Sequence, residues 1–249
     1  MTNAPDEKTY ALVSNALNKK ICAKLEAAGA ANPILFPAAQ TEKIDLDDYS
    51  LALLRDLANF DWLIFSDVLT VDYFLQILEE NEIDIFELDA ARVCAVGEAV
   101  ADRLRFVQLH SDVIPTLIDE ESVCAALSGY IGAEKIGGAS FLSVKRKSSE
   151  IKIESLLTKT GARVRQLEIY CAEIIADSAA NARLKALLKG GAIDEFVFSS
   201  PEDLIALEQL FSDDKPRRIL SEVNVSAIDN VIFQTLKEHG LKPRFFRAG

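Results

Sequence analysis

Short apolar runs and amphipathic segments alternate along the whole chain. Val71, Phe74, Leu75 and Leu78 follow the i, i+3, i+4, i+7 spacing of one helix face, directly after the apolar run at 61–65. Similar runs predict strands at 10–13, 32–37, 93–96, 141–144, 164–170, 196–198 and 225–228. Amphipathic segments predict helices at 17–28, 49–58, 99–106, 119–130, 151–159, 181–188 and 231–237, and also after Ser66-Asp67 and Ser200-Pro201. This alternation predicts an α/β fold whose parallel sheets carry helices on both faces.

The chain also repeats itself at an offset of 132 or 133 residues. The stretch DWLIFSDVLTV, from Asp61, has a counterpart in DEFVFSSPEDL, from Asp194. The matched positions are Phe65 with Phe198, Ala95-Val96-Gly97 with Ala227-Ile228-Asp229, Gly29-Ala30 with Gly161-Ala162, and Leu25 with Leu157. A constant offset in separate stretches indicates one duplicated unit that fills the chain. We therefore expect two similar lobes with a cleft between them.

Composition narrows the class of protein. With 249 residues, 49% of them apolar and 27% charged, the chain is expected to be a soluble globular protein. No apolar run approaches the roughly 18 residues of a membrane span. The start MTNAPDEKTY has neither a basic segment nor an apolar one, which predicts a cytoplasmic location. The four cysteines lie far apart among apolar neighbours, so we expect reduced, buried thiols and no metal site.

The formal net charge of −12 disfavours nucleic acid as a partner, because a surface that follows phosphates needs clustered cations. An anionic small molecule remains compatible, since it responds to the local field of its site. One dense basic cluster occurs, Lys145-Arg146-Lys147, with Lys152 following. This cluster is either a solvated surface or part of an anion site.

Polar residues follow the predicted strands at equivalent places. Ligands of doubly wound sheets bind at the carboxyl ends of strands, where helices begin and free N–H groups suit carboxylates and phosphates. These positions are Ser66-Asp67, Gly97-Glu98, Ser199-Ser200 and Asp229-Asn230. Ordinary helix capping explains Ser66 and Ser200 equally well. Hydrolase chemistry is disfavoured, because neither His110 nor His239 has a serine or cysteine nearby in a recognisable motif.

Together these pieces resemble the uroporphyrinogen-III synthase family over nearly the whole chain. The matching stretches are IFSDVLTV, VFSSPEDL, AVGEAVADRL and SLLTKTGARVRQLEIY. The resemblance implies two similar doubly wound parallel-sheet lobes joined by a two-stranded connector. It implies a crossed assignment, with residues 1–38 and 171–249 in lobe 1 and residues 39–170 in lobe 2. It also implies a monomer that needs neither metal nor organic cofactor.

The resemblance implies an activity as well. The substrate would be hydroxymethylbilane, a linear tetrapyrrole with eight carboxylates, which is cyclised with loss of water and inversion of its last pyrrole ring. The tyrosine that helps the hydroxyl to leave maps onto Tyr170, and a phenol is a suitable donor for that role. A buried tyrosine at the end of a strand is the structural alternative. The substrate-binding positions map onto Ser66, Gly97, Lys145, Ser199, Ser200 and Asn230.

The sequence departs from the family pattern at several turns. Ser14-Asn15 stands where the family has Arg-Pro, and Val100 where it has a hydroxyl residue. The stretch from Lys145 to Glu150 keeps the positive charge of the family's glycine-rich turn but has none of its glycines. Asp229 heads a turn that is Gly-Pro-Thr-Thr in the family, and with Asp67 it would repel substrate carboxylates. These departures leave a second hypothesis open, a non-catalytic bilobal homologue that binds tetrapyrroles or a partner protein. A periplasmic-type solute binder is disfavoured by the absence of a signal peptide.

Overall fold

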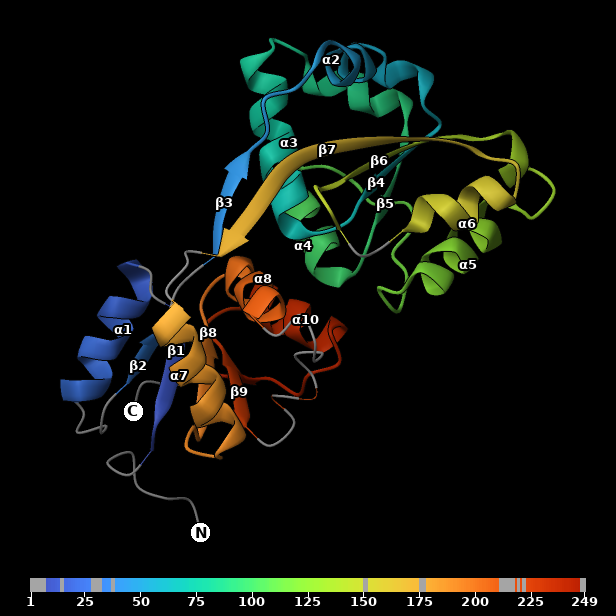
Figure 1. Cartoon of the computed structure of the whole chain (residues 1–249). Helices are drawn as coiled ribbons and strands as arrows, with labels where there is room; N and C mark the ends of the chain where they lie inside the picture. The colour runs from blue at the N-terminus through green and yellow to red at the C-terminus, as the bar shows by residue number, and fades with distance from the viewer. Residues whose placement is uncertain are drawn as a thin grey trace. The chain divides into compact units, whose positions relative to one another are not determined.

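The computed structural model describes residues 8–13, 16–27, 33–36, 39–149, 152–174, 178–210, 218, 220 and 223–246. The chain forms two compact units (Figure 1). Unit 1 comprises Met1–Thr41 and Ala172–Gly249, and unit 2 comprises Glu42–Cys171. Each unit is built on its own five-stranded sheet. None of the helices in the described ranges is long and apolar enough to span a membrane.

The sheet of unit 1 has the strand order β10-β9-β8-β1-β2. Its strands are β1 (Tyr10–Val13), β2 (Ile34–Phe36), β8 (Glu195–Phe198), β9 (Asn224–Ala227) and β10 (Arg244–Phe245), and every neighbouring pair is parallel. The helices are α1 (Ala16–Ala27), α7 (Ser178–Lys189), α8 (Pro201–Leu210) and α10 (Asn230–Glu238). Alternate residues of β1 serve opposite faces: Leu12 packs with Leu25 of α1, whereas Val13 belongs to the cluster with α7, α8 and α10.

The sheet of unit 2 has the strand order β3-β7-β6-β4-β5. Its strands are β3 (Ala39–Lys43), β4 (Trp62–Phe65), β5 (Arg92–Ala95), β6 (Ser140–Arg146) and β7 (Arg163–Ile174). The pairs among β5, β4, β6 and β7 are parallel. The helices are α2 (Asp48–Arg55), α3 (Val68–Glu80), α4 (Glu98–Phe106), α5 (Glu120–Ile131) and α6 (Ile153–Lys159), with short 3-10 turns at Leu57–Asn59, Ile85–Ala90 and Ile136–Gly138.

Unit 2 is also covered on both faces, as its buried clusters show. Trp62 and Ile64 of β4 pack with residues of α5 and α6. Phe65 points to the other face, where its ring meets Phe74 of α3 edge-on at 5.2 Å. Both sheets are therefore doubly wound, which confirms the predicted fold class.

The two units repeat one arrangement. The strand–helix–strand segment β1-α1-β2 of unit 1 corresponds to β6-α6-β7 of unit 2. On the other side of the sheet centre, β8 and β9 of unit 1 correspond to β4 and β5 of unit 2. Beyond β9, unit 1 adds the edge strand β10. At the equivalent place beyond β5, unit 2 has a single parallel bridge from Cys94 to Val113. Leu25 and Leu157, matched by the sequence offset, are both buried at equivalent places in α1 and α6. The Gly29 half of the third matched pair lies outside the described residues. Each unit thus combines one half of each repeat.

The chain passes between the units within β3 and within β7, which are neighbours in the sheet of unit 2 and run in opposite directions (Figure 1). These two strands are the connector. The sequence predicted no strand at Ala39–Lys43, because AQTEK has no apolar alternation. Ile44 N–H donates to the Ile169 carbonyl at 2.9 Å, so backbone pairing with β7 supplies what the side chains do not. The lobe boundaries inferred from the sequence, after 38 and after 170, stay a prediction.

Candidate functional site

The strand order of unit 2 identifies where a ligand would bind. From β4 the chain goes to β5 on one side, and β6 lies on the other side of β4, so the winding direction changes between β4 and β6. Doubly wound sheets bind ligands beyond the carboxyl ends of the strands at such a point. The residues there are Ser66-Asp67 after β4 and Arg146-Lys147 at the end of β6.

Asp67 organises the start of α3. Its Oδ1 accepts from the Thr70 N–H at 2.8 Å, and its own N–H donates to Thr70 Oγ1 at 3.2 Å, which is a complete capping box. The Ser66 hydroxyl donates to Asp67 Oδ2 at 3.0 Å. The Thr70 N–H at this helix start therefore donates to a carboxylate of the chain itself, and Ser66 acts here as part of the cap.

Asp67 also interacts with two neighbouring strands. Burial raises the pKa of the Asp67 carboxyl, while hydrogen bonds from Thr70, Ser66 and the Tyr170 side chain and the positive charge of Arg146 act against that rise. Arg146 and Tyr170 are register partners across β6 and β7, at a point where the register shifts by one residue. Such a bulge changes the direction of side chains, and bulges are common beside active sites.

Tyr170 is fully buried, with 0% of its surface exposed. Its ring stacks on Tyr73 of α3 at a centroid distance of 5.1 Å and an interplanar angle of 20°. The predicted proton donor thus lies beside Asp67 and Arg146, but in this structure its hydroxyl has no contact with solvent. Any contact with a substrate requires a rearrangement that uncovers it.

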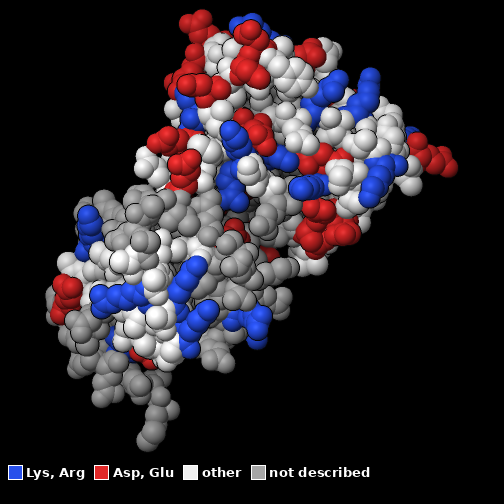
Figure 2. Space-filling model, in the orientation of Figure 1, with Lys and Arg blue, Asp and Glu red and all other residues white. Residues whose placement is uncertain are grey.

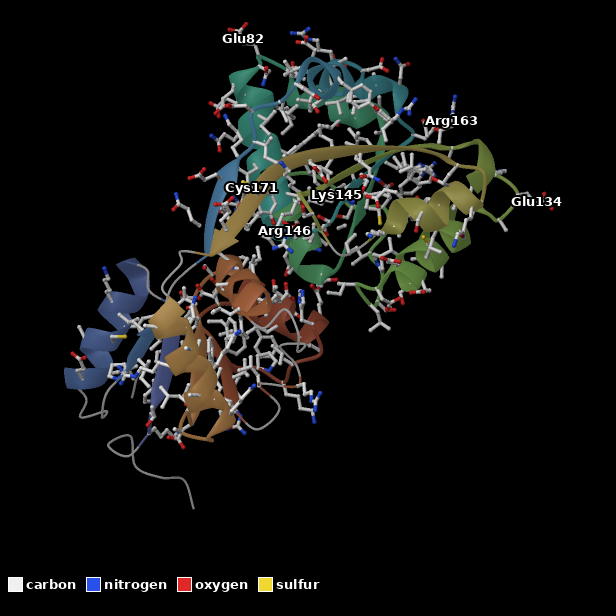
Figure 3. All side chains as sticks on the ribbon, viewed as in Figure 1. Glu82, Glu134, Lys145, Arg146, Arg163 and Cys171 are labelled. Carbon is white, nitrogen blue, oxygen red and sulfur yellow. The ribbon has the colours of Figure 1, made fainter. Side chains whose placement is uncertain are left out.

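Lys145 points away from this group. It is 5% exposed, and its Nζ lies 2.9 Å from Glu154 Oε1 of α6. The Ser143 hydroxyl donates to the same Glu154 oxygen at 2.9 Å. Lys145 thus contacts α6, whereas the charge of Arg146 acts on Asp67 at the start of α3, so the two neighbours serve different elements (both are labelled in Figure 3). The lysine selected from the sequence is thus engaged in a buried ion pair.

Gly97 begins α4 after β5. Its φ of 101° lies in the region that favours glycine, which explains this residue type at the turn. Its carbonyl accepts from the Ala101 N–H at 3.2 Å, and no side chain caps the helix at this position. Gly97 therefore shares the carboxyl edge of the sheet with Ser66, one strand further out.

Unit 1 places Ser199 and Ser200 at the equivalent edge, between β8 and α8. Both serines bind one carboxylate, Asp203 in the first turn of α8. Asp203 Oδ2 accepts from Ser199 N–H at 2.7 Å, Ser199 Oγ at 2.9 Å and Ser200 N–H at 3.1 Å, and Oδ1 accepts from Ser200 Oγ at 3.0 Å. Asp203 is 1% exposed, and burial raises the pKa of its carboxyl.

The last predicted position, Asn230, is exposed at the start of α10. Asp229 before it caps the helix, since its Oδ1 accepts from the Ile232 N–H at 2.9 Å. The corresponding turn after β1, with Ser14-Asn15, lies outside the described residues. The structure thus groups Ser199, Ser200 and Asn230 at the carboxyl ends of β8 and β9, and Ser66 and Gly97 at those of β4 and β5. Tyr170 lies within β7, which continues to Ile174, at the level of Arg146 at the end of β6.

Sequence reasoning did not assign roles to Arg146 and Asp203. A signal for Asp203 was present, because Ser200 with an acid three residues later is a capping pattern. No signal could separate Arg146 from Lys145, since the choice depends on which face of the sheet each residue takes. Acidic and basic side chains are interspersed over the face of unit 2 seen in Figure 2, so the net charge does not form one acidic field there.

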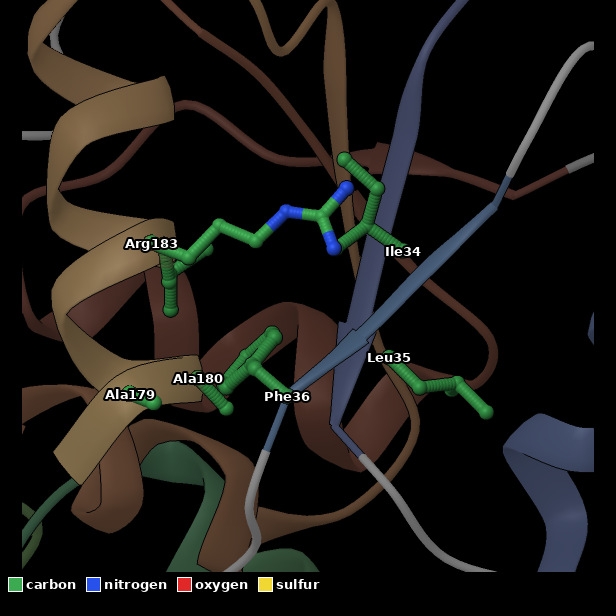
Figure 4. A pocket seen from close by; sticks show the side chains of 7 residues that line it. Ile34, Leu35, Phe36, Ala179, Ala180 and Arg183 are labelled. Atoms are coloured by element: carbon green, nitrogen blue, oxygen red, sulfur yellow. The ribbon is translucent and has the colours of Figure 1, made fainter. Parts of the chain in front are cut away.

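Unit 1 also has an apolar cavity of about 300 Å³ between β2 and α7 (Figure 4). It is lined by Ile34, Leu35, Phe36, Ala179, Ala180, Arg183 and Leu184. Arg183 is the charged member of this lining. None of the residues selected from the sequence lines the cavity, and the described part of the chain contains no group of three or more side chains suited to a metal ion.

Comparison with known proteins gives consistent results. The family model for "Uroporphyrinogen-III synthase HemD" matches residues 19–246. Among solved structures, wild-type uroporphyrinogen III synthase of the extremely thermophilic bacterium Thermus thermophilus is similar at a TM-score of 0.64 and 21% identity, over 96% of this chain and 91% of that one. A second structure of the Thermus thermophilus enzyme gives a TM-score of 0.62 at 22% identity, over 95% and 91%. These likenesses support the fold, and the family match covers most of the sequence. The chain therefore belongs to the uroporphyrinogen-III synthase family, whose members are lyases of tetrapyrrole biosynthesis.

Proposed function

We propose that this chain converts hydroxymethylbilane into uroporphyrinogen III, closing the ring with inversion of the last pyrrole and release of water. The observation that carries the proposal is the family match over residues 19–246. The two doubly wound units support it, because they place polar helix starts at the carboxyl edge of each sheet. The protein is proposed to act as a monomer in the cytoplasm without a cofactor.

Tyr170 is the proposed proton donor. When the C–O bond of the hydroxymethyl group breaks, the electron pair stays on the oxygen, and a phenol proton delivered to that oxygen lets water leave. The Tyr170 side chain lies near enough to Asp67 to lower the pKa of its carboxyl, and the charge of Arg146 acts on the same carboxylate. The positive charge nearby offsets the negative charge that a phenolate would add.

The test is the isomer produced from freshly generated hydroxymethylbilane. The purified protein should yield the type III isomer, whereas the type I isomer forms spontaneously. Y170F should lower kcat by about 100-fold, the usual contribution of a positioned proton donor. Y130F is the matched control, because Tyr130 is 49% exposed on α5 and packs edge-on against Trp62, away from Tyr170. A protein that gives only the type I isomer would end the proposal.

A second candidate function has its own support. The helix starts at Asp67 and Asp203 are occupied by carboxylates of the chain, and Tyr170 has no exposed surface. These features fit a homologue that binds a tetrapyrrole without converting it. Calorimetric titration with a tetrapyrrole decides between the two, since tight binding without turnover favours the binder and rapid turnover excludes it.

A further inference from the structure

Two adjacent cations at the end of β6 have opposite environments. Lys145 is buried, and its charge is paired with Glu154 at 2.9 Å. A buried lysine that pairs with a carboxylate is already neutralised and desolvated, so it has no capacity left for a second anion. The positive charge available at this edge of the sheet must come from a neighbour.

Arg146 meets that need. It lies at the carboxyl end of β6, beside the position where the winding of the sheet changes direction, and it is only partly buried. Its Nη1 atom is shielded from solvent and has no hydrogen-bond partner among the described residues. Buried polar atoms in proteins are nearly always hydrogen-bonded, so an unsatisfied guanidinium nitrogen at a ligand edge indicates a missing acceptor.

We infer that Arg146, and not Lys145, is the carboxylate-binding cation of unit 2, and that it takes a side-chain carboxylate of a tetrapyrrole. A guanidinium presents donors in a planar fork that matches a carboxylate, and such charge-assisted pairs are short and directional. The inference rests on the proposed function for the identity of the ligand. It concerns binding only, so it can be tested apart from turnover.

Asp67 competes with the ligand carboxylate for the charge of Arg146. The groups that face its carboxylate are Ser66 on the same turn, Thr70 on α3, Tyr170 on β7 and Arg146 on β6. Without a ligand, the Asp67 charge offsets part of the Arg146 charge. With a ligand, the same charge repels the incoming carboxylate. Removing the Asp67 charge should therefore strengthen anion binding, an effect opposite to that of removing the Arg146 charge.

The experiment measures the Kd of uroporphyrin III, the stable oxidised form of the proposed product, from porphyrin fluorescence. R146Q should weaken binding by at least about tenfold, and R146K should recover part of that loss, because lysine restores the charge but not the fork. D67N should tighten binding by roughly fivefold. The matched control is K159Q, which makes the same charge change at an exposed lysine in the last turn of α6, away from the carboxyl edge of the sheet, and should stay within about twofold of wild type. Thermal melts confirm that each variant is folded.

The outcomes separate the inference from the proposed function. If wild type makes the type III isomer but R146Q binds uroporphyrin III like wild type, Arg146 is not the anchor and the function stands. If wild type makes only the type I isomer yet binds the porphyrin in an Arg146-dependent way, the anchor stands and the function fails. If wild type does not bind the porphyrin at all, or K159Q weakens binding as much as R146Q, the inference is wrong.

Discussion

The starts of α3 and α8 are equivalent positions of the two repeats, and in both the side chain at the third helical position accepts from the N–H of the residue before the helix. In α3 the acid comes first and the hydroxyl residue third in the helix, as Asp67 and Thr70. In α8 the order is reversed, with Ser200 at the cap and Asp203 in the first turn. Both carboxylates have a raised pKa because of burial. The two repeats share the cap and differ in the residues that form it.

The two caps differ in what else they contact. Asp203 binds only Ser199 and Ser200 among the contacts described above, and both lie within four residues of it in the sequence. Asp67 in addition reaches Tyr170 and Arg146 on two other strands. The α8 cap therefore stabilises its own turn, whereas the α3 cap joins three strands at the proposed site. In both units a carboxylate of the chain occupies the helix start, which is why the carboxylates of the substrate are assigned to cations.

The largest expected effect concerns stability. D203A removes an acceptor from two backbone N–H groups and two hydroxyls in a buried turn. We expect the free energy of unfolding to fall by about 3 kcal/mol, as a cap and its buried donors are lost together. Urea denaturation measures this. D229A is the matched control, because Asp229 caps α10 from an exposed position through one backbone bond and should cost about 1 kcal/mol. Equal losses in the two variants would contradict the account of Asp203.

The next test exchanges the caps. D67S/T70D gives α3 the residue order of α8. The free energy of unfolding should stay within about 1 kcal/mol of wild type, because a serine cap with an acid in the first turn still forms the box. Turnover should fall by about tenfold, because the carboxylate no longer lies beside Tyr170. The unfolding and turnover measurements are made on the same preparation of the variant. Unchanged turnover would show that Asp67 is only a cap.

The smallest expected effect is a dependence of folding stability on pH. The folded-state pKa of Asp203 lies above its unfolded value, so this group favours the folded state at low pH and its contribution is lost as pH rises through the folded pKa. The stability of wild type relative to D203N should therefore decrease as pH rises above about 4, the pKa of an unperturbed aspartate. Carboxyls with a lowered pKa, such as Asp61, have the opposite slope, but they cancel in the comparison because both proteins contain them. A difference that rises with pH would refute the assignment.

Much of the fold was readable from the sequence because its signals are local. The apolar run at Trp62–Phe65 is a buried strand, and the offset that pairs Phe65 with Phe198 does mark equivalent strand ends. The polar strand Ala39–Lys43 was missed because its pairing is a property of β7, not of its own side chains. The spacing of apolar residues shows whether a segment is a helix or a strand, so that could be predicted. The pairing of a strand depends on its partner, so that could not.

The site was less predictable for the same reason. Lys145 and Arg146 are adjacent and chemically alike, and a shift of one position exchanges the faces they serve. The burial of Tyr170 depends on Tyr73, which approaches from a helix far earlier in the chain. The sequence indicated that these residues lie at the carboxyl edge of each sheet, but which side chain is accessible there depends on tertiary packing.

The crossed assembly of the repeats also constrains how the protein is made. Unit 2 is a continuous segment, Glu42–Cys171, and can fold on the ribosome as soon as it has emerged. Strand β1 of unit 1 must wait for β8, its neighbour in the sheet, which is synthesised only after the whole of unit 2. During that interval β1 and α1 lack the strand that completes their packing, and the apolar side chains of Leu12 and Leu25 wait for Val197 of β8.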